Sequence, residues 1–274
     1  MILWLGNRAA ASKRIAMKHT PCSRLLGQRG KRPVGKILAG LLWAVIASGL
    51  NTSSGQTAEP QANSPAEFDA YLNILAKTTP EGVISATEMF ERNWPHSELC
   101  GKVNEMEMEA FRSLNNATGA IRAGAKALAV NPDNPAVLAS LAYILADSFS
   151  DSQHLAQAER DARKEIEISE KLHIPRWILP NEWDRNRSAI DSEAHAALGL
   201  IAYKQGNIRK AIQEFEMAIK MNPSPDPAQD YRLGVLYQAA GNKVKAIQEL
   251  RLAANSKDTA IRMRAQRELK ALQH

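Results

Sequence analysis

The side chains that most often bind metals or carry out catalysis are scattered along this chain of 274 residues. No two of its six histidines have the four-residue spacing of a helical zinc site, and it has no cysteine cluster. It also contains no glycine-rich phosphate loop, Gly-x-Ser-x-Gly elbow or Gly-x-Gly-x-x-Gly turn. We therefore predict no catalytic residue, no metal site, no cofactor and no enzymatic activity.

Carboxylates give one alternative to this prediction. Glu165, Glu167 and Glu170 are interleaved with lysines, as is typical of a solvated helix face. Glu182 and Asp184, on either side of Trp183, are the pair that most resembles a catalytic one. A rival interpretation is therefore an envelope enzyme whose site lies in residues 173–187.

Two cysteines occur, Cys22 and Cys100. Cys22 precedes an apolar run in the N-terminal leader, so removal of that leader would leave Cys100 alone and exclude an intramolecular disulfide. We expect Cys100 to be a half-buried thiol at the junction of two helical units. Intermolecular pairing or redox sensing is the alternative.

The elements that must position these side chains repeat. The residue types of one segment recur 35 positions later. Each copy has an apolar stretch of helical period, a Gly-Asn turn and a second apolar stretch of helical period. The paired positions are Leu198-Gly199 and Leu233-Gly234, Gly206-Asn207 and Gly241-Asn242, Ala211 and Ala246, Phe215 and Leu250, and Ala218 and Ala253. Such a unit is a helical hairpin that buries its apolar face only by stacking on a neighbour.

At these residues the chain resembles the tetratricopeptide-repeat family. A copy upstream matches at Ala120-Ile121, Ala127-Leu128 and Asn131-Pro132, but Glu107-Met108 replaces Leu-Gly, so we expect looser packing there. A weaker unit begins near Pro65 and places Phe68, Tyr71 and Ile74 on one face. The resemblance implies an all-α solenoid of about four to five stacked hairpins with a C-terminal capping helix.

Helix start signals indicate where the units of this array begin. Ser64-Pro65, Thr79-Pro80, Asn134-Pro135 and Asp226-Pro227 each place a capping side chain before a proline. The unit opening at Pro135 carries an insertion near residues 146–191, which we interpret as a long helix from about Gln153 to Leu172 followed by a loop over His173–Arg187. The capping helix is expected from Thr259 to Leu272, with Ile261, Ala265, Leu269 and Leu272 on its packed stripe.

The N-terminal segment predicts export. Residues 1–36 hold nine basic and no acidic residues, and an apolar run follows from Ile37 to Leu50. We therefore predict an export signal or membrane anchor at residues 1–50, a flexible linker at 51–64 and the solenoid at 65–274, with Met1 or Met17 as the start. The predicted location is the bacterial periplasm or exterior. The alternative is the inner membrane, held by a single uncleaved anchor.

The charge pattern bears on the partners. The leader supplies nine positive charges, so the net charge of +6 becomes −3 for the remainder. A concentrated basic face, as nucleic-acid binding requires, is not indicated. We expect no nucleic acid, and contact with membrane only through the N-terminal segment.

The most promising surface is the inner wall that the resemblance assigns to the first helix of each unit. Its exposed face is expected to carry Glu193, Ala196, Leu200, Tyr203, Lys204, Ala228, Tyr231, Val235 and Gln238, with Tyr143 and Arg112 from preceding units. Because tyrosine combines contact area with a polar tip, this wall suits a peptide or a partner helix. The family's clamp for a C-terminal carboxylate is not supported. Packing between first helices is the alternative role of the tyrosines.

These observations predict a non-enzymatic scaffold that binds a protein or peptide in a groove. The groove residues are Arg112, Tyr143, Tyr203, Lys204, Tyr231 and Gln238, with Trp177 and Trp183 as a lip. The two tryptophans have an alternative role as a plug within their own scaffold. A second rival is the same solenoid serving as an inner-membrane assembly factor for an envelope complex.

Overall fold

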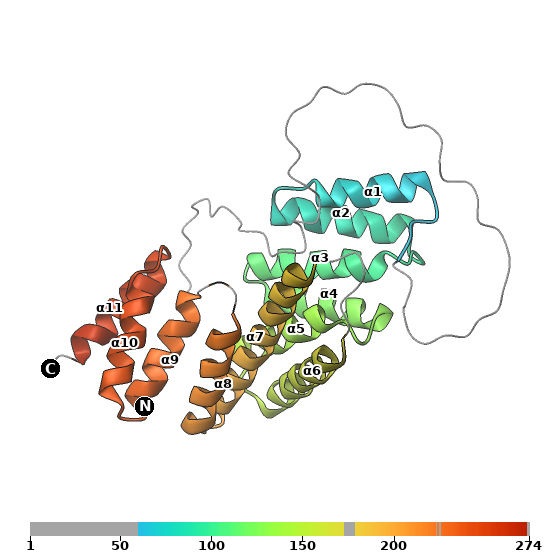
Figure 1. Ribbon diagram of the computed structural model, residues 1–274. Helices are drawn as coiled ribbons and strands as arrows, with labels where there is room; N and C mark the ends of the chain where they lie inside the picture. The colour runs from blue at the N-terminus through green and yellow to red at the C-terminus, as the bar shows by residue number, and fades with distance from the viewer. Residues whose placement is uncertain (1–59, 173–178, 223, 225, 273–274) are drawn as a thin grey trace. The chain divides into compact units, whose positions relative to one another are not determined.

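A computed structural model describes residues 60–172, 179–222, 224 and 226–272. Within these residues the chain forms helices and no strand, as predicted. Figure 1 shows them following one another as hairpins. Their bounds are α1 Pro65–Leu75, α2 Pro80–Asn93, α3 Cys100–Ser113, α4 Ala117–Val130, α5 Pro135–Ser148, α6 Ser152–Lys171, α7 Pro180–Lys204, α8 Ile208–Met221, α9 Pro227–Ala239, α10 Lys243–Ala254 and α11 Thr259–Ala271.

Each odd-numbered helix up to α9 packs against the helix that follows it, which gives five hairpins, and α11 packs on α10. The four expected cap–proline starts are confirmed: the side chains of Ser64, Thr79, Asn134 and Asp226 each accept a backbone N–H of the helix they open. The array of hairpins with a terminal helix therefore has the predicted architecture.

Glycines let the two helices of a hairpin approach closely. A Cβ atom on Gly199 would lie 2.7 Å from the Phe215 ring, and one on Gly234 would lie 2.7 Å from Leu250. Gly206, after the first helix, has φ +79°, a left-handed conformation that glycine adopts at little cost. The close packing expected at these repeat positions is confirmed.

The α3–α4 hairpin is packed as tightly as its neighbours, so the expected looseness there was wrong. Met108, where a small residue was anticipated, is only 1 % exposed. The space comes from Gly124 on α4, where an added Cβ would lie 2.8 Å from the Met108 sulfur. A large residue on one helix is thus matched by a glycine on the other.

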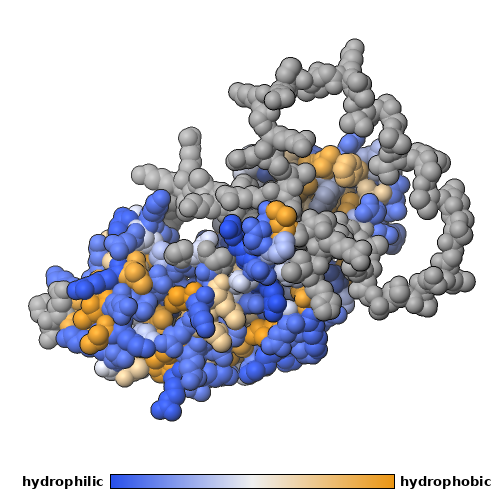
Figure 2. Space-filling model, viewed as in Figure 1, coloured by the Kyte–Doolittle hydropathy of each residue, from blue (hydrophilic) through white to orange (hydrophobic). Residues whose placement is uncertain are grey.

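The two ends of the array differ. Ala265 of α11 is buried against Leu250 and Ala253, and Ile261, Leu269 and Leu272 pack on this cluster as expected. On α1 only Ile74 of the expected apolar face is fully buried, whereas Phe68 is 50 % exposed, because no preceding hairpin packs there in the described residues. Figure 2 shows an apolar area over α1 and α2.

The region of the predicted insertion consists mainly of longer helices. The expected long helix is α6, which spans Ser152–Lys171. The expected loop over His173–Arg187 was wrong for its second half, because α7 already begins at Pro180. Residues 173–178, which include Trp177, lie outside the described residues.

Two further observations concern a cysteine and the possibility of a membrane span. Cys100 is a buried free thiol at the start of α3, and burial raises its pKa above the ordinary value. No helix in residues 60–172, 179–222 and 226–272 is long and apolar enough to cross a membrane.

Candidate functional site

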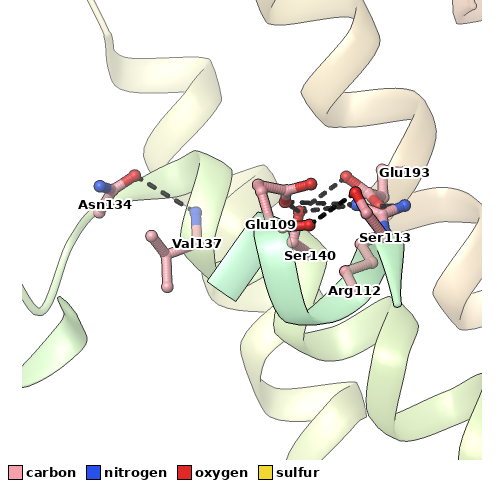
Figure 3. A network of polar contacts seen from close by, with 7 residues as sticks. All are labelled: Glu109, Arg112, Ser113, Asn134, Val137, Ser140 and Glu193. Atoms are coloured by element: carbon pink, nitrogen blue, oxygen red, sulfur yellow. Dashed lines mark hydrogen bonds and ion pairs between the residues drawn. The ribbon is translucent and has the colours of Figure 1, made fainter. Parts of the chain in front are cut away.

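The predicted groove residues come from the first helices α3, α5, α7 and α9. Arg112 of α3 is the centre of a polar network shown in Figure 3. It forms an ion pair with Glu193 of α7 and another with Glu109 of its own helix, at 3.5 Å. It also donates to the hydroxyl of Ser140 on α5, at 3.2 Å. One guanidinium therefore links three first helices.

The electrostatics of this network follow from its burial. Burial by itself would lower the pKa of Arg112, but the carboxylates of Glu193 and Glu109 outweigh it and raise that pKa. Burial raises the pKa of Glu109, an effect that Arg112 opposes. Ser140 donates to one carboxylate while it accepts from Arg112, since its oxygen lies 3.1 Å from both Glu109 and Glu193. The side chains thus satisfy one another.

A second link starts from α9. Arg232 donates to the phenol oxygen of Tyr143 on α5, and it forms an ion pair of 2.7 Å with Asp147. The Tyr143 ring has two guanidinium groups close to it, with Arg112 at 5.5 Å and Arg232 at 5.4 Å from its centroid. This arrangement adds cation–π attraction from both arginines. Burial raises the pKa of Tyr143, so the phenol is neutral at physiological pH.

The other predicted groove residues are placed differently. Lys204 closes the C-terminal end of α5, because its ammonium donates to the carbonyl oxygens of Asp147 at 3.0 Å and of Phe149 at 2.6 Å. Burial lowers the pKa of this ammonium. Tyr203 is half-buried against the main core, whereas Tyr231 packs on the C-terminal cluster that contains Leu250. The three predicted tyrosines are therefore divided between two clusters.

Parts of the expected exposed face are closed. Ala196 is fully buried and Leu200 is only 4 % exposed, so their assignment to an open wall was wrong. The reason is that α5 and α7 pack directly on each other along this face. Gln238 is half-buried, and its side-chain oxygen has no hydrogen-bond partner. Trp183 is half-buried within α7 rather than in a loop.

Four residues of these links were missed in the sequence: Glu109, Ser140, Asp147 and Arg232. The spacing of three between Glu109 and Arg112 on one helix was a usable signal for the first. Ser140, Asp147 and Arg232 join positions at least 28 residues apart, and no local pattern marks them.

The arrangement offers contacts rather than reaction chemistry. Glu182 and Asp184, the pair that resembled catalytic carboxylates, are exposed on the first turns of α7. Among the described residues, no group of three His, Cys, Asp or Glu side chains is placed to hold a metal ion. The polar side chains of Arg112, Ser140 and Arg232 hold first helices together.

Comparison with known proteins identifies the repeat. The model of the tetratricopeptide repeat matches residues 192–225, which comprise the end of α7, α8 and the turn after it. No curated protein sequence matches the chain.

Solved structures of repeat proteins are similar to the chain at low sequence identity. TTC0263, a tetratricopeptide-repeat protein of Thermus thermophilus, is 16 % identical with a TM-score of 0.50, over 75 % of this chain and 96 % of that one. A tetratricopeptide-repeat protein from Parabacteroides merdae is 13 % identical with a TM-score of 0.43, over 77 % and 86 %. PilW, a type IV pilus biogenesis factor, is 13 % identical with a TM-score of 0.39, over 73 % and 98 %.

Proposed function

Because the chain is a tetratricopeptide-repeat protein, we propose that it is a non-enzymatic scaffold that binds a protein partner on the face formed by α3, α5, α7 and α9. The observation that carries this proposal is the contact of the Tyr143 ring with the guanidinium groups of both Arg112 and Arg232. Arginine and tyrosine, together with tryptophan, are enriched among the residues that dominate the binding energy of protein interfaces. Side chains already held in place also lose less conformational entropy on binding.

The same face indicates where a partner would gain affinity. Tyr203, Tyr231 and Asp147 keep part of their surface exposed, and Asp147 is 40 % exposed. Arg232, by contrast, is 15 % exposed and occupied by Asp147. A partner would therefore contact the tyrosines and the rim of the network, while the half-buried Arg112 and Arg232 hold the helices together.

The location is a further part of this proposal, and it is supported by the sequence alone. Residues 1–36 are basic, and the run from Ile37 to Leu50 is apolar, the order found in secretory signals. We place the scaffold in the bacterial periplasm or at the cell envelope. If the signal is not cleaved, the same scaffold is an inner-membrane assembly factor, and mass spectrometry of the mature N-terminus distinguishes the two.

The binding proposal is tested by affinity capture from envelope extract with the full chain, followed by titration of the recovered partner. The test variant replaces Tyr203 and Tyr231 with alanine. The control replaces Met217 and Val244, which are 41 % and 79 % exposed on α8 and α10, with alanine. We expect the test variant to lose about 30-fold or more in affinity, which corresponds to about 2 kcal/mol.

Circular dichroism and melting of both variants complete the experiment. Loss of affinity with the fold intact in the tyrosine variant alone supports the proposed face. Loss only in the Met217 and Val244 control would move the binding surface to the second helices. Unchanged affinity in both variants would contradict a role of the two tyrosines.

A further inference from the structure

Glu165 of α6 is fully buried at the contact with α7. Its side chain is 0 % exposed, and neither carboxylate oxygen has a hydrogen-bond donor. The group acting on it most strongly is the carboxylate of Asp191 on α7. Two carboxylates facing each other in a buried contact repel if both are charged. Burying a carboxylate without a hydrogen-bond donor also costs free energy, so this contact requires a cation or a proton to offset the charge.

The neighbouring cation, Arg187, does not offset the charge of Glu165. Arg187 donates through Nε to the hydroxyl of Ser169 at 3.1 Å and lies 3.6 Å from Asp191. The Ser169 hydroxyl in turn donates to the other oxygen of Asp191. Arg187 thus serves Asp191 and Ser169, and Glu165 is left without a donor of its own.

The other charged groups near Glu165 are also engaged or acidic. Glu193 of α7 adds negative charge and is held by Arg112. On α5, which packs along α6, the ionisable side chains are Tyr143 and Asp147, and Arg232 binds both. On α6 itself, one turn before Glu165, Asp161 is a half-buried carboxylate whose pKa is raised by burial. The cation that acts on Glu165 is Arg187, which Ser169 and Asp191 already engage.

We propose that Glu165 and Asp191 share one proton, and that this proton is a pH-sensitive latch between α6 and α7. A proton on Glu165 converts the contact between two acceptors into a hydrogen bond from Glu165 to Asp191. Burial, and then the Asp191 charge, raise the pKa of Glu165 to about 8, so the proton is held at neutral pH and lost in mild alkali. A metal ion is not indicated, because the described residues contain no metal-binding group of three ligands.

The position of this contact gives it mechanical importance. α6 has 20 residues and α7 has 25, whereas the other described helices have 11 to 14. Glu165 and Asp191 lie where α6 and α7 reach the length of the other helices, and Ser169 and Arg187 lie just beyond that length, at the start of the longer part of this contact. Release of the proton would weaken this extension first, together with Trp183 near the start of α7.

The first test is a carbon-13 NMR titration of the glutamate carboxyl groups in the full chain, with Glu165 assigned by its loss in Glu165→Gln. We expect this signal to titrate near pH 8. In Asp191→Asn the titration midpoint should move down by about one pH unit or more, because the neighbouring negative charge is gone. A midpoint near the ordinary glutamate value, or one that is unchanged in Asp191→Asn, would overturn the shared proton.

The second test follows melting between pH 6 and pH 9. The wild type should lose about 5–10 °C across this range. Glu165→Gln should keep its melting temperature, because glutamine donates to Asp191 at every pH. Glu167→Gln, a change at an exposed position two residues away on α6, is the matched control and should fall as the wild type does. Equal pH profiles for Glu165→Gln and the wild type would overturn the latch.

Discussion

Arg232 of α9 donates a hydrogen bond to the phenol oxygen of Tyr143 on α5, although α6, α7 and α8 all lie between these residues in the sequence. In the same way, Arg112 of α3 forms an ion pair with Glu193 of α7, although α4, α5 and α6 lie between these residues in the sequence. First helices two units apart are therefore tied directly by side chains. In a repeat array, where contacts are expected mainly between neighbours, such ties couple more distant units.

The Arg232 tie should contribute measurably to stability. Arg232→Ala removes the ion pair with Asp147, the hydrogen bond to Tyr143 and one cation–π contact, in a place where the arginine is 15 % exposed. We expect a loss of about 1–3 kcal/mol in the free energy of unfolding, measured with urea. Arg163→Ala is the control, because it breaks an exposed pair within α6 and should cost less than about 0.5 kcal/mol. Equal losses of unfolding free energy in the two variants would show that the contacts of Arg232 stabilise the protein no more than an exposed ion pair does.

A methyl group at Gly199 should destabilise the α7–α8 hairpin. The added Cβ would lie 2.7 Å from the Phe215 ring, which is itself 1 % exposed and has little room to move. We expect Gly199→Ala to lower the unfolding free energy by about 1–3 kcal/mol. At Gly101 the nearest atom is 3.3 Å away, on the exposed Val130 side chain, so Gly101→Ala should be neutral or stabilising. Thermal melting of the two variants compares them directly.

Asp230 should make the protein less stable as the pH rises. This carboxyl of α9 is 8 % exposed, and burial, followed by the charges of Glu249 and Asp226, raises its pKa to about 6. Between the unfolded pKa near 4 and about 6, the folded state binds more protons than the unfolded state. The unfolding free energy therefore falls with rising pH in that window.

Asp230→Asn removes this titration. We expect the variant to be more stable than the wild type by about 1–2 kcal/mol at pH 7.5, and to show no advantage at pH 4. Urea unfolding at both pH values measures the difference. A constant difference at the two pH values would point to packing rather than to the charge of Asp230.

Export should depend on the apolar run at residues 37–50, which lies outside the described residues. Arginines at Leu42 and Val45 would each oppose insertion by about 2.5–3.5 kcal/mol. We expect the doubly substituted protein to stay in the cytosol, as judged by cell fractionation. The same two arginines at Thr57 and Ala62, in the predicted linker, should leave export intact. Normal fractionation of the Leu42 and Val45 variant would contradict an export signal.

Much of the fold could be predicted from local patterns. The cap–proline pairs marked helix starts, and the 35-residue recurrence marked the hairpins, because capping and helical periodicity depend on residues close in sequence. The loop expected up to Arg187 failed for a related reason. Pro180 is itself a helix start, but its cap Leu179 makes no side-chain hydrogen bond and so lacked the usual signal. The looseness expected at Met108 failed because the compensating Gly124 lies on another helix.

The candidate site was less predictable. Helical spacing selected Arg112 and Tyr143 for the first-helix face, but it could not show that both are already bound by the protein itself. It also assigned Ala196 and Leu200 to an open wall, although α5 covers that part of α7. Which residues face a helix's neighbour depends on how closely the two helices approach, and that distance is a property of the whole packed array.

The sequence by itself determined that this protein is a stack of helical hairpins, because each hairpin is specified by caps, turn glycines and small residues within about 35 positions of one another. Only the tertiary structure decided that Arg232 meets Tyr143, that Arg112 meets Glu193, and that Glu165 is buried beside Asp191. These pairs join different helices, and the helices come together only when the hairpins stack. Side-chain charge and burial at such contacts are therefore set by packing, not by local sequence.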